Sequence, residues 1–119
     1  MLRQMCKGKI HSAAVTETKL YYEGSVTIDS ALLEAVDIIP GEKVEVLNLH
    51  NGSRIETYVM EGEKDGGVIC LNGPAARWAQ IGDKVIILSY ALLDEAEIRK
   101  GWQSRTAIVG EGNKIEKVV

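Results

Sequence analysis

Two short stretches of the chain repeat one pattern, and this repeat limits the folds that the sequence can adopt. Residues 39–46 (IPGEKVEV) and 80–87 (QIGDKVII) both read as a turn with glycine, an acidic residue and lysine, followed by a strand that opens with valine. A barrel with an internal two-fold axis places two such units symmetrically. Gly-acid-Lys is also common turn chemistry, so a chance match of two turns stays open.

Short β-prone segments separated by turns fill most of the remaining chain. Asn51-Gly52 predicts a hairpin, Asp29 predicts a helix N-cap, and Pro74 predicts the start of a helical turn. The expected strands are 3–11, 12–18, 25–28, 43–49, 54–60, 68–71, 85–88 and 106–109, with helical segments at 30–36, 75–78 and within 93–100, a loop at 61–67 and a loose tail at 114–118. We expect the run 85–88 to be buried on both faces. Many short strands are typical of a closed barrel or a sandwich.

Size and charge exclude several classes of function. With 119 residues the chain is expected to form one domain, and its net charge of −3 argues against nucleic-acid binding. No apolar run approaches a membrane span, and the start lacks the features of a signal peptide, so we expect a cytoplasmic protein. Cys6 and Cys70 are expected to be free thiols. His11 and His50 lack metal-ligand spacing, and no metal is expected.

The tetrapeptide Tyr22-Glu23-Gly24-Ser25 carries the most reactive chemistry in the sequence. A serine hydroxyl can attack the carbonyl of the residue before it and shift the acyl group from nitrogen to oxygen. β-Elimination of that ester and hydrolysis then leave a pyruvoyl group at a new N-terminus. Glycine before the serine gives the backbone the freedom that such an attack needs. Gly-Ser read alone is a common loop dipeptide.

Several polar residues further along the chain suit this chemistry. Arg54 and Lys9 are candidate carboxylate binders, although each read alone is a solvated surface cation. Thr57 and Asn72 are candidate donors to a developing oxyanion. Thr57 and Tyr58 are adjacent on an expected strand and so point to opposite faces, a conflict that a bulge or a site between subunits removes. Tyr58 also suits a core or edge ring.

Taken in order, these motifs resemble one family closely, the pyruvoyl-dependent aspartate 1-decarboxylases. The resemblance covers nearly the whole chain and is least distinctive after Leu88. The motifs that carry it are Lys9-Ile10-His11, Tyr22-Glu23-Gly24-Ser25, Asn51-Gly52-Ser53-Arg54, Thr57-Tyr58, Asn72-Gly73-Pro74-Ala75-Ala76 and Gly82-Asp83-Lys84-Val85-Ile86-Ile87.

The resemblance implies a mainly β fold, a double-psi β-barrel with short helices, assembled as a homotetramer with active sites between subunits. It implies a single domain, 1–119, that cleaves itself between Gly24 and Ser25 into chains 1–24 and 25–119. The implied reaction converts L-aspartate to β-alanine and CO2 for pantothenate and coenzyme A synthesis. The implied cofactor is the pyruvoyl group derived from Ser25, which forms a Schiff base with the substrate amine.

The resemblance also implies a role for each matching residue. Arg54 and Lys9 hold the two substrate carboxylates, and Tyr58 is the proton donor. The remaining implied site residues are Thr57 and Asn72, which assist cleavage and position the pyruvoyl group; Gly73, Pro74 and Ala75, which contact substrate with Thr57; and His11 and Tyr22, which line the pocket. Two alternatives remain: a non-catalytic barrel that serves as a binding module, and a pyruvoyl enzyme for another acidic amino acid. The need for an accessory maturation factor also stays open.

Overall fold

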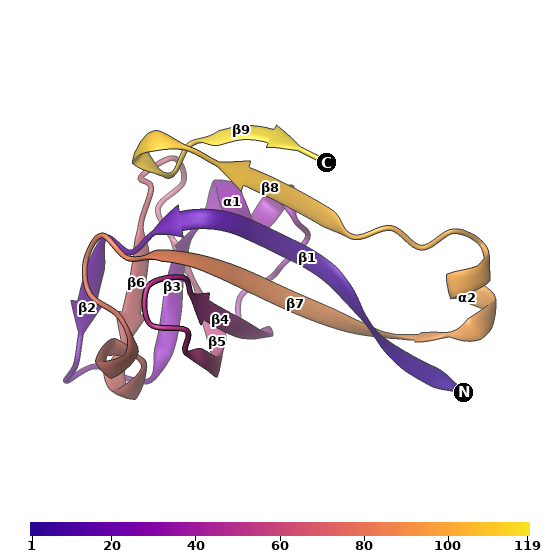
Figure 1. Ribbon diagram of the computed structural model, residues 1–119, viewed down its shortest axis with the longest axis horizontal. Helices are drawn as coiled ribbons and strands as arrows, with labels where there is room; N and C mark the ends of the chain where they lie inside the picture. The colour runs from indigo at the N-terminus through magenta and orange to yellow at the C-terminus, as the bar shows by residue number, and fades with distance from the viewer.

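The computed structural model describes residues 1–119 and consists mainly of β-strands with short helices between them (Figure 1). Nine strands form one sheet: β1 (Leu2–Ala14), β2 (Glu17–Lys19), β3 (Ser25–Asp29), β4 (Lys43–Asn48), β5 (Arg54–Gly62), β6 (Ile69–Asn72), β7 (Lys84–Asp94), β8 (Arg105–Val109) and β9 (Ile115–Val118). The helical elements are α1 (Ser30–Ala35), α2 (Glu95–Arg99) and the 3₁₀ turns η1 (Gly73–Trp78) and η2 (Glu111–Asn113). No helix has the length and apolar character that crossing a membrane requires.

The sheet curls until its terminal strand β2 meets the end of β1. The strand order is β2-β6-β3-β5-β4-β7-β1-β8-β9, yet only Val15 and Thr16 separate β1 from β2 along the chain. At this junction the Val15 N–H donates to the Asp83 carbonyl oxygen (2.9 Å) and the Thr16 N–H donates to the Ile69 carbonyl oxygen (2.8 Å). Strand β1 thus continues into β2 and links β7 to β6, which closes a barrel.

The strand pairs fall into two equivalent sets. Strands β3 and β5 are parallel, as are β6 and β2, while β4–β5 and β7–β1 are antiparallel. A pseudo-two-fold axis therefore exchanges β3 with β6, β4 with β7, and β5 with the joined β1–β2 strand. The two central pairs, β3–β6 and β4–β7, are antiparallel and map onto themselves. This interlocked arrangement is the predicted double-psi β-barrel.

The two repeated sequence stretches form the same turn. In the first, the Ile39 N–H donates to Glu42 Oε1 (3.2 Å), and the Glu42 N–H donates back to the Ile39 carbonyl oxygen (3.1 Å). In the second, the Gln80 N–H donates to Asp83 Oδ2 (2.9 Å), and the Asp83 N–H donates back to the Gln80 carbonyl oxygen (3.0 Å). The acidic residue therefore closes both turns in one way, and the repeat is structural and not a chance match.

The glycines of these turns also have equivalent partners. Gly41 and Gly82 both have a positive φ, +88° and +95°, which favours glycine. The Gly41 N–H donates to the Val59 carbonyl oxygen on β5, and the Gly82 N–H donates to the Val15 carbonyl oxygen at the end of β1, both at 2.8 Å. The first turn is thus bonded to β5, and the second turn is bonded to the joined β1–β2 strand, which the pseudo-two-fold axis exchanges with β5.

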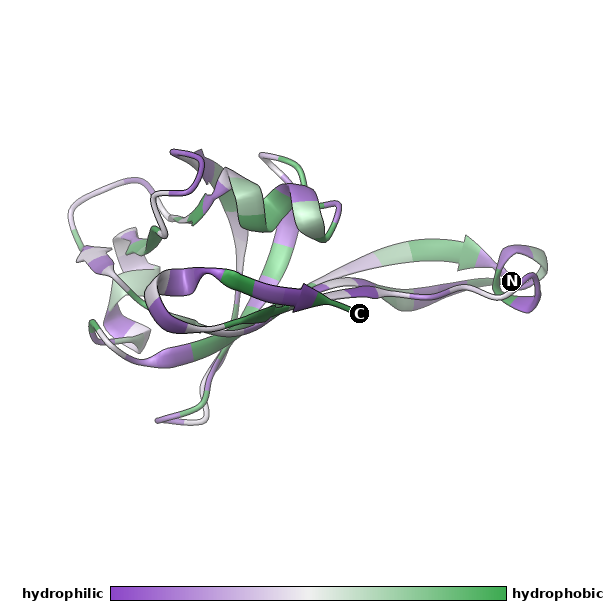
Figure 2. Cartoon of the chain, turned by 90° about the horizontal axis from the view of Figure 1, so that it is seen from above, coloured by the Kyte–Doolittle hydropathy of each residue, from purple (hydrophilic) through white to green (hydrophobic).

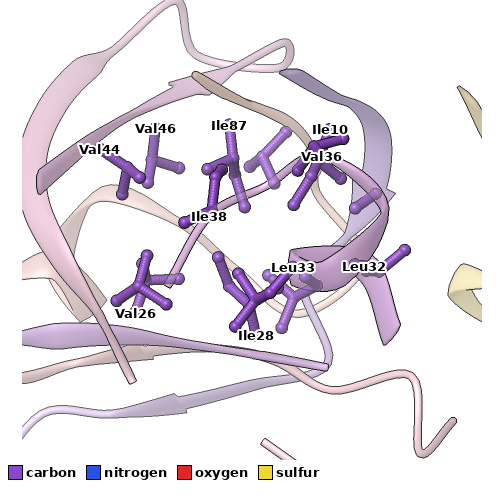
Figure 3. Close-up of a cluster of buried hydrophobic side chains, with 14 of the residues drawn as sticks. Ile10, Val26, Ile28, Leu32, Leu33, Val36, Ile38, Val44, Val46 and Ile87 are labelled. Atoms are coloured by element: carbon purple, nitrogen blue, oxygen red, sulfur yellow. The ribbon is translucent and has the colours of Figure 1, made fainter. Parts of the chain in front are cut away.

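Alternating apolar side chains fill the barrel interior. Figure 3 shows most of these side chains pointing toward a common centre from β1, β3, β4, β7 and α1. They include Ile10, Val26, Ile28, Leu32, Leu33, Val36, Ile38, Val44, Val46 and Ile87, each at most 3% exposed. The predicted N-cap is confirmed, because Asp29 accepts a hydrogen bond from the Ala31 N–H (2.8 Å). The hairpin at Asn51-Gly52 is confirmed by the antiparallel β4–β5 pair.

Strands β1 and β7 extend beyond the barrel as a two-stranded arm. Their pairing runs from Ala14↔Lys84 out to Leu2↔Asp94, and α2 lies at the tip (Figures 1 and 2). The predicted break of β1 near residue 11 and the predicted end of β7 at Leu88 are therefore wrong. Each strand continues because the other pairs with it, and isolated sequence segments do not contain that information.

Three further expectations are corrected. The run 85–88 is not buried on both faces, because Ile86 and Leu88 are only half-buried on the outer face of the barrel. The expected loose tail is a strand, β9, which pairs with β8 through Ala107↔Val118 and Ile108↔Lys117. The expected loop at 61–67 is shorter, since β5 runs to Gly62.

Candidate active site

The Gly24-Ser25 peptide bond lies where an exposed loop enters the barrel wall. Gly24 is exposed, whereas Ser25, the first residue of β3, has no solvent-accessible surface. Ser25 is an intact serine here, so the geometry is that of the uncleaved chain. The bond between these residues therefore has one open side and one fully enclosed side.

Four polar side chains form a square on the outer face of the wall. Ser25 and Thr27 lie two residues apart on β3, and they face Asn72 and Cys70 directly across the antiparallel β3–β6 pair. Positions two apart on a strand share a face, and directly opposed residues are neighbours. The opposite face of the same strands carries core residues such as Val26 and Leu71. The square is therefore a polar cluster separate from the hydrophobic core.

Asn72 holds the Ser25 hydroxyl in place. Its Nδ2 lies 2.9 Å from Ser25 Oγ and 3.0 Å from Thr27 Oγ1, and Asn72 is 1% exposed. The Ser25 hydroxyl in turn faces the Glu23 carbonyl oxygen at 3.4 Å and the Met60 thioether at 3.1 Å. The predicted donor and the predicted nucleophile thus meet in one chain, and the nucleophile is enclosed by defined partners.

Gly73 presses against the backbone that precedes Ser25. Its φ is +65°, and a Cβ built there lies 2.7 Å from the Tyr22 carbonyl oxygen and 2.9 Å from both N and Cα of Gly24. A side chain has no room at this position. The absence of a Cβ lets the start of η1 support the loop that carries the Gly24-Ser25 bond.

A cleft of about 350 Å³ opens beside Gly24. It is lined by Gly24, Ile55, Glu56, Thr57, Tyr58, Pro74, Ala75 and Trp78. Thr57 and Tyr58 both line it although no bulge interrupts the β4–β5 register. Tyr58 is 41% exposed and precedes Val59, the parallel partner of Val26, so it lies alongside Ser25 on the outer face. The structure therefore brings five predicted site residues to one cleft.

Arg54 lies in a different depression, of about 420 Å³, which it lines with Gln4, Lys43, Val44, Glu45, Glu56 and Tyr90. Its Nη1 is 3.1 Å from Glu45 Oε1, and the Tyr90 hydroxyl donates to the same oxygen at 2.7 Å. This hydrogen bond to Glu45 raises the pKa of Tyr90, with burial adding to the effect. Glu45 therefore anchors the guanidinium of Arg54 and a neutral phenol together.

Lys9 and His11 lie away from both depressions within one chain. They are half-buried on β1, where they pair with Leu88 and Ile86 of β7. Strands β7 and β4 lie between β1 and β5 in the sheet order, so Lys9 and Arg54 lie on separate parts of the barrel wall. Tyr22 is half-exposed in the loop, where Lys19 Nζ lies 5.8 Å from the centre of its ring. Tyr22 does not line the cleft beside Gly24.

Two residues near Ser25 were missed by the sequence analysis, Cys70 and Met60. The sequence contains a signal for Cys70, which lies two positions before Asn72 on the same face of β6. Met60 gives no such signal, because its approach to Ser25 depends on the non-local β3–β5 pair.

The strand pairings define a double-psi β-barrel protein, and comparison with known proteins gives its family. A family model described as aspartate decarboxylase matches residues 1–116, and the chain belongs to this family. Three relatives are each called aspartate 1-decarboxylase. The relative from Carboxydothermus hydrogenoformans is 54% identical over 99% of this chain and 92% of its own. Those from Burkholderia ambifaria and Listeria monocytogenes are 50% and 54% identical over 98% and 100% of this chain and 91% and 93% of theirs.

Among solved structures, the rationally designed mkDPBB_sym_86 protein aligns with 65% of this chain and 90% of its own, with a TM-score of 0.49 and 20% identity. The fold described above rests on the strand pairings and not on this likeness.

Proposed function

We propose that this chain decarboxylates L-aspartate to β-alanine and CO2 after cleaving itself between Gly24 and Ser25. The observation that carries the proposal is the Ser25 hydroxyl, fully buried at the start of β3 and 2.9 Å from Asn72 Nδ2, next to an exposed glycine. Membership of the aspartate decarboxylase family and the names of the relatives support the substrate.

Cleavage starts when Ser25 Oγ attacks the carbonyl carbon of Gly24. The C–O bond forms as the peptide C–N bond breaks, and the freed nitrogen takes up a proton. Loss of the Cα proton of residue 25 then expels the Gly24 carboxylate from Cβ and leaves dehydroalanine. One water hydrolyses that group, releases ammonia and leaves pyruvoyl at residue 25. The products are chains 1–24 and 25–119.

The residues around Ser25 fit these steps. Asn72 donates toward Oγ and so favours negative charge developing on that atom. Gly24 faces the open cleft, from which water would reach residue 25 once the Gly24 carboxylate has left. Gly73 supports the backbone on the other side without a Cβ in the way. The enclosed Ser25 side of the bond thus serves positioning, and the open Gly24 side would give water its access to residue 25 after the elimination.

For decarboxylation, a pyruvoyl group at residue 25 would supply a carbonyl that serves as an electron sink for the bond that releases CO2. Tyr58 lies on the open cleft and is the proposed donor of the proton that replaces CO2. Thr57, Pro74 and Ala75 line the same cleft and would contact the substrate beside it. Gly73 lets the backbone approach closely.

The two proposed carboxylate binders point to a site shared between subunits. Lys9 and Arg54 are held apart by two strands of the same chain, so one chain does not present both cations to one substrate. We therefore place the site between copies in a homotetramer, where His11 and Tyr22 would complete the pocket. The product would feed pantothenate and coenzyme A synthesis in the cytoplasm.

The test is intact mass spectrometry combined with an assay of β-alanine formation. Wild-type protein should give two chains that split after Gly24, the larger one lighter by one ammonia than its serine form. Ser25→Ala should stay full length and inactive. Ser89→Ala is the matched control, because Ser89 is equally buried but its hydroxyl has no hydrogen-bond partner and lies on β7.

Two outcomes would reject the proposal. Activity retained by Ser25→Ala would exclude Ser25 as the source of the cofactor. If cleaved wild-type protein decarboxylates glutamate in preference to aspartate, the proposed self-cleavage stands and aspartate is rejected as the substrate.

A further inference from the structure

Cys70 lies in the polar square beside Ser25 and has a defined partner there. It is 3% exposed, sits opposite Thr27 in the β3–β6 pair, and its Sγ is 3.2 Å from Asn72 Oδ1. The Asn72 side chain therefore bridges two groups. Its Oδ1 faces the thiol, and its Nδ2 faces the hydroxyls of Ser25 and Thr27.

The thiol decides which end of the Asn72 amide faces Ser25. A hydroxyl both donates and accepts, so Ser25 and Thr27 satisfy either end of the amide equally well. A thiol has one proton to give and is a weak acceptor, so Cys70 prefers the carbonyl end. Burial raises the pKa of Cys70, nearby Glu17 raises it further, and Lys19 opposes the effect. The group at residue 70 thus remains a protonated donor at neutral pH.

The orientation of the amide matters for the attack on Gly24. With Oδ1 toward Cys70, both hydrogens of Nδ2 are used, one on Ser25 Oγ and one on Thr27 Oγ1. A donor at Oγ stabilises the negative charge that develops there as the hydroxyl loses its proton. The reversed amide presents a carbonyl oxygen to Oγ instead and opposes that charge.

We propose that Cys70 is a positioning residue for self-cleavage, whose thiol holds the Asn72 amide with its N–H toward the nucleophile Ser25. This inference rests on the proposed function and extends it to a residue that touches neither the substrate nor the bond that breaks. Cys70 acts through Asn72, so we expect its loss to slow self-cleavage.

The test compares Cys70→Ala with Cys70→Ser, two variants that differ by one hydroxyl. Each is made by cell-free synthesis, and cleavage is followed by intact mass against time. Loss of the donor in Cys70→Ala should slow cleavage about tenfold, the scale of one buried hydrogen bond. Cys70→Ser keeps a donor and should cleave within about threefold of the wild-type rate. Cys6→Ala is the control, because Cys6 is the other free cysteine and lies on β1.

A stability measurement separates positioning from packing. Both substitutions are also made in the uncleavable Ser25→Ala chain, and their unfolding temperatures are compared. The proposal expects cleavage to follow the donor while the two unfolding temperatures stay close.

The outcomes distinguish this inference from the proposed function. A wild-type chain that never cleaves rejects the proposed function, and the role of Cys70 with it. A wild-type chain that cleaves while Cys70→Ala keeps pace rejects the role of Cys70 alone. Cys70→Ser cleaving as slowly as Cys70→Ala also rejects it, since a donor at residue 70 then has no effect.

Discussion

Replacing Gly73 by alanine tests whether the close contact at the Gly24 backbone is as tight as the structure indicates. The added Cβ meets three backbone atoms at 2.7–2.9 Å, and φ is +65°. Backbone strain of a non-glycine residue at positive φ costs about 1 kcal/mol or more, and overpacking adds about 1–3 kcal/mol. We expect a loss of about 3 kcal/mol, or ~12 °C in Tm for a chain of this length.

Gly52→Ala is the matched control for this prediction. Gly52 has a similar φ of +73° but nothing within 4 Å of the added Cβ, so it carries the strain without the contact. Its expected cost is about 1 kcal/mol, or ~4 °C. Both variants are unfolded thermally in the uncleavable Ser25→Ala background at one protein concentration, since assembly makes Tm depend on concentration.

The cleavage rate gives a second readout of the same contact. Gly73→Ala in the cleavable chain should cleave at least about tenfold more slowly, because the Tyr22–Gly24 backbone must shift by several tenths of an ångström to admit the Cβ. Gly52→Ala should cleave at the wild-type rate. Equal Tm losses for the two glycines, or unchanged cleavage in Gly73→Ala, would refute the reasoning.

Two further predictions concern stability. Asp29→Ala should cost about 3 kcal/mol in chemical denaturation, because Asp29 caps α1 and also accepts two N–H groups of the loop after β5 at 2.9 Å each. Asp94 is an exposed cap that accepts one such bond, so Asp94→Ala should lower the stability by at most about 1 kcal/mol. Equal losses for the two variants would contradict the assignment of the larger loss to the two loop hydrogen bonds of Asp29. Tyr90→Phe should flatten the loss of stability at alkaline pH. The pKa of Tyr90 is raised by Glu45, so its contribution is present below about pH 10 and is lost as pH rises through the folded-state pKa. Identical profiles for wild type and Tyr90→Phe between about pH 9 and 11 would oppose this assignment.

Features set by local chemistry were predictable from the sequence. Asn51-Gly52 forms its hairpin because the turn itself favours glycine at positive φ. Asp29 caps α1 through its own side chain, within two residues of its partner. The fold and the roles around Ser25 came from the resemblance of ordered motifs, and Ser25 and Asn72 do meet in the structure.

Features set by pairing between distant segments were not predictable in the same way. The length of β7 depends on β1, more than seventy residues earlier, and no local signal marks its end at Asp94. The separation of Lys9 from Arg54 follows from the strand order. In the sequence, only the repeat of residues 39–46 and 80–87 indicates that order. Cys70 was interpreted as an ordinary free thiol, because its link to Ser25 through Asn72 becomes visible only when β3 and β6 are placed side by side.

The pairing of β1 along the whole of β7 has a consequence for the cut enzyme. The proposed cleavage after Gly24 would separate β1 and β2 covalently from the rest of the chain, yet β1 would stay hydrogen-bonded to β7 and β8, and β2 to β6. The loop proposed to be cut carries none of these strand pairings, so the barrel would persist as a complex of two chains. Once such a complex unfolds, its fragments must find each other again, and recovery becomes dependent on their concentration. The mature protein would therefore owe its lifetime to slow unfolding, since its precursor alone refolds as one chain.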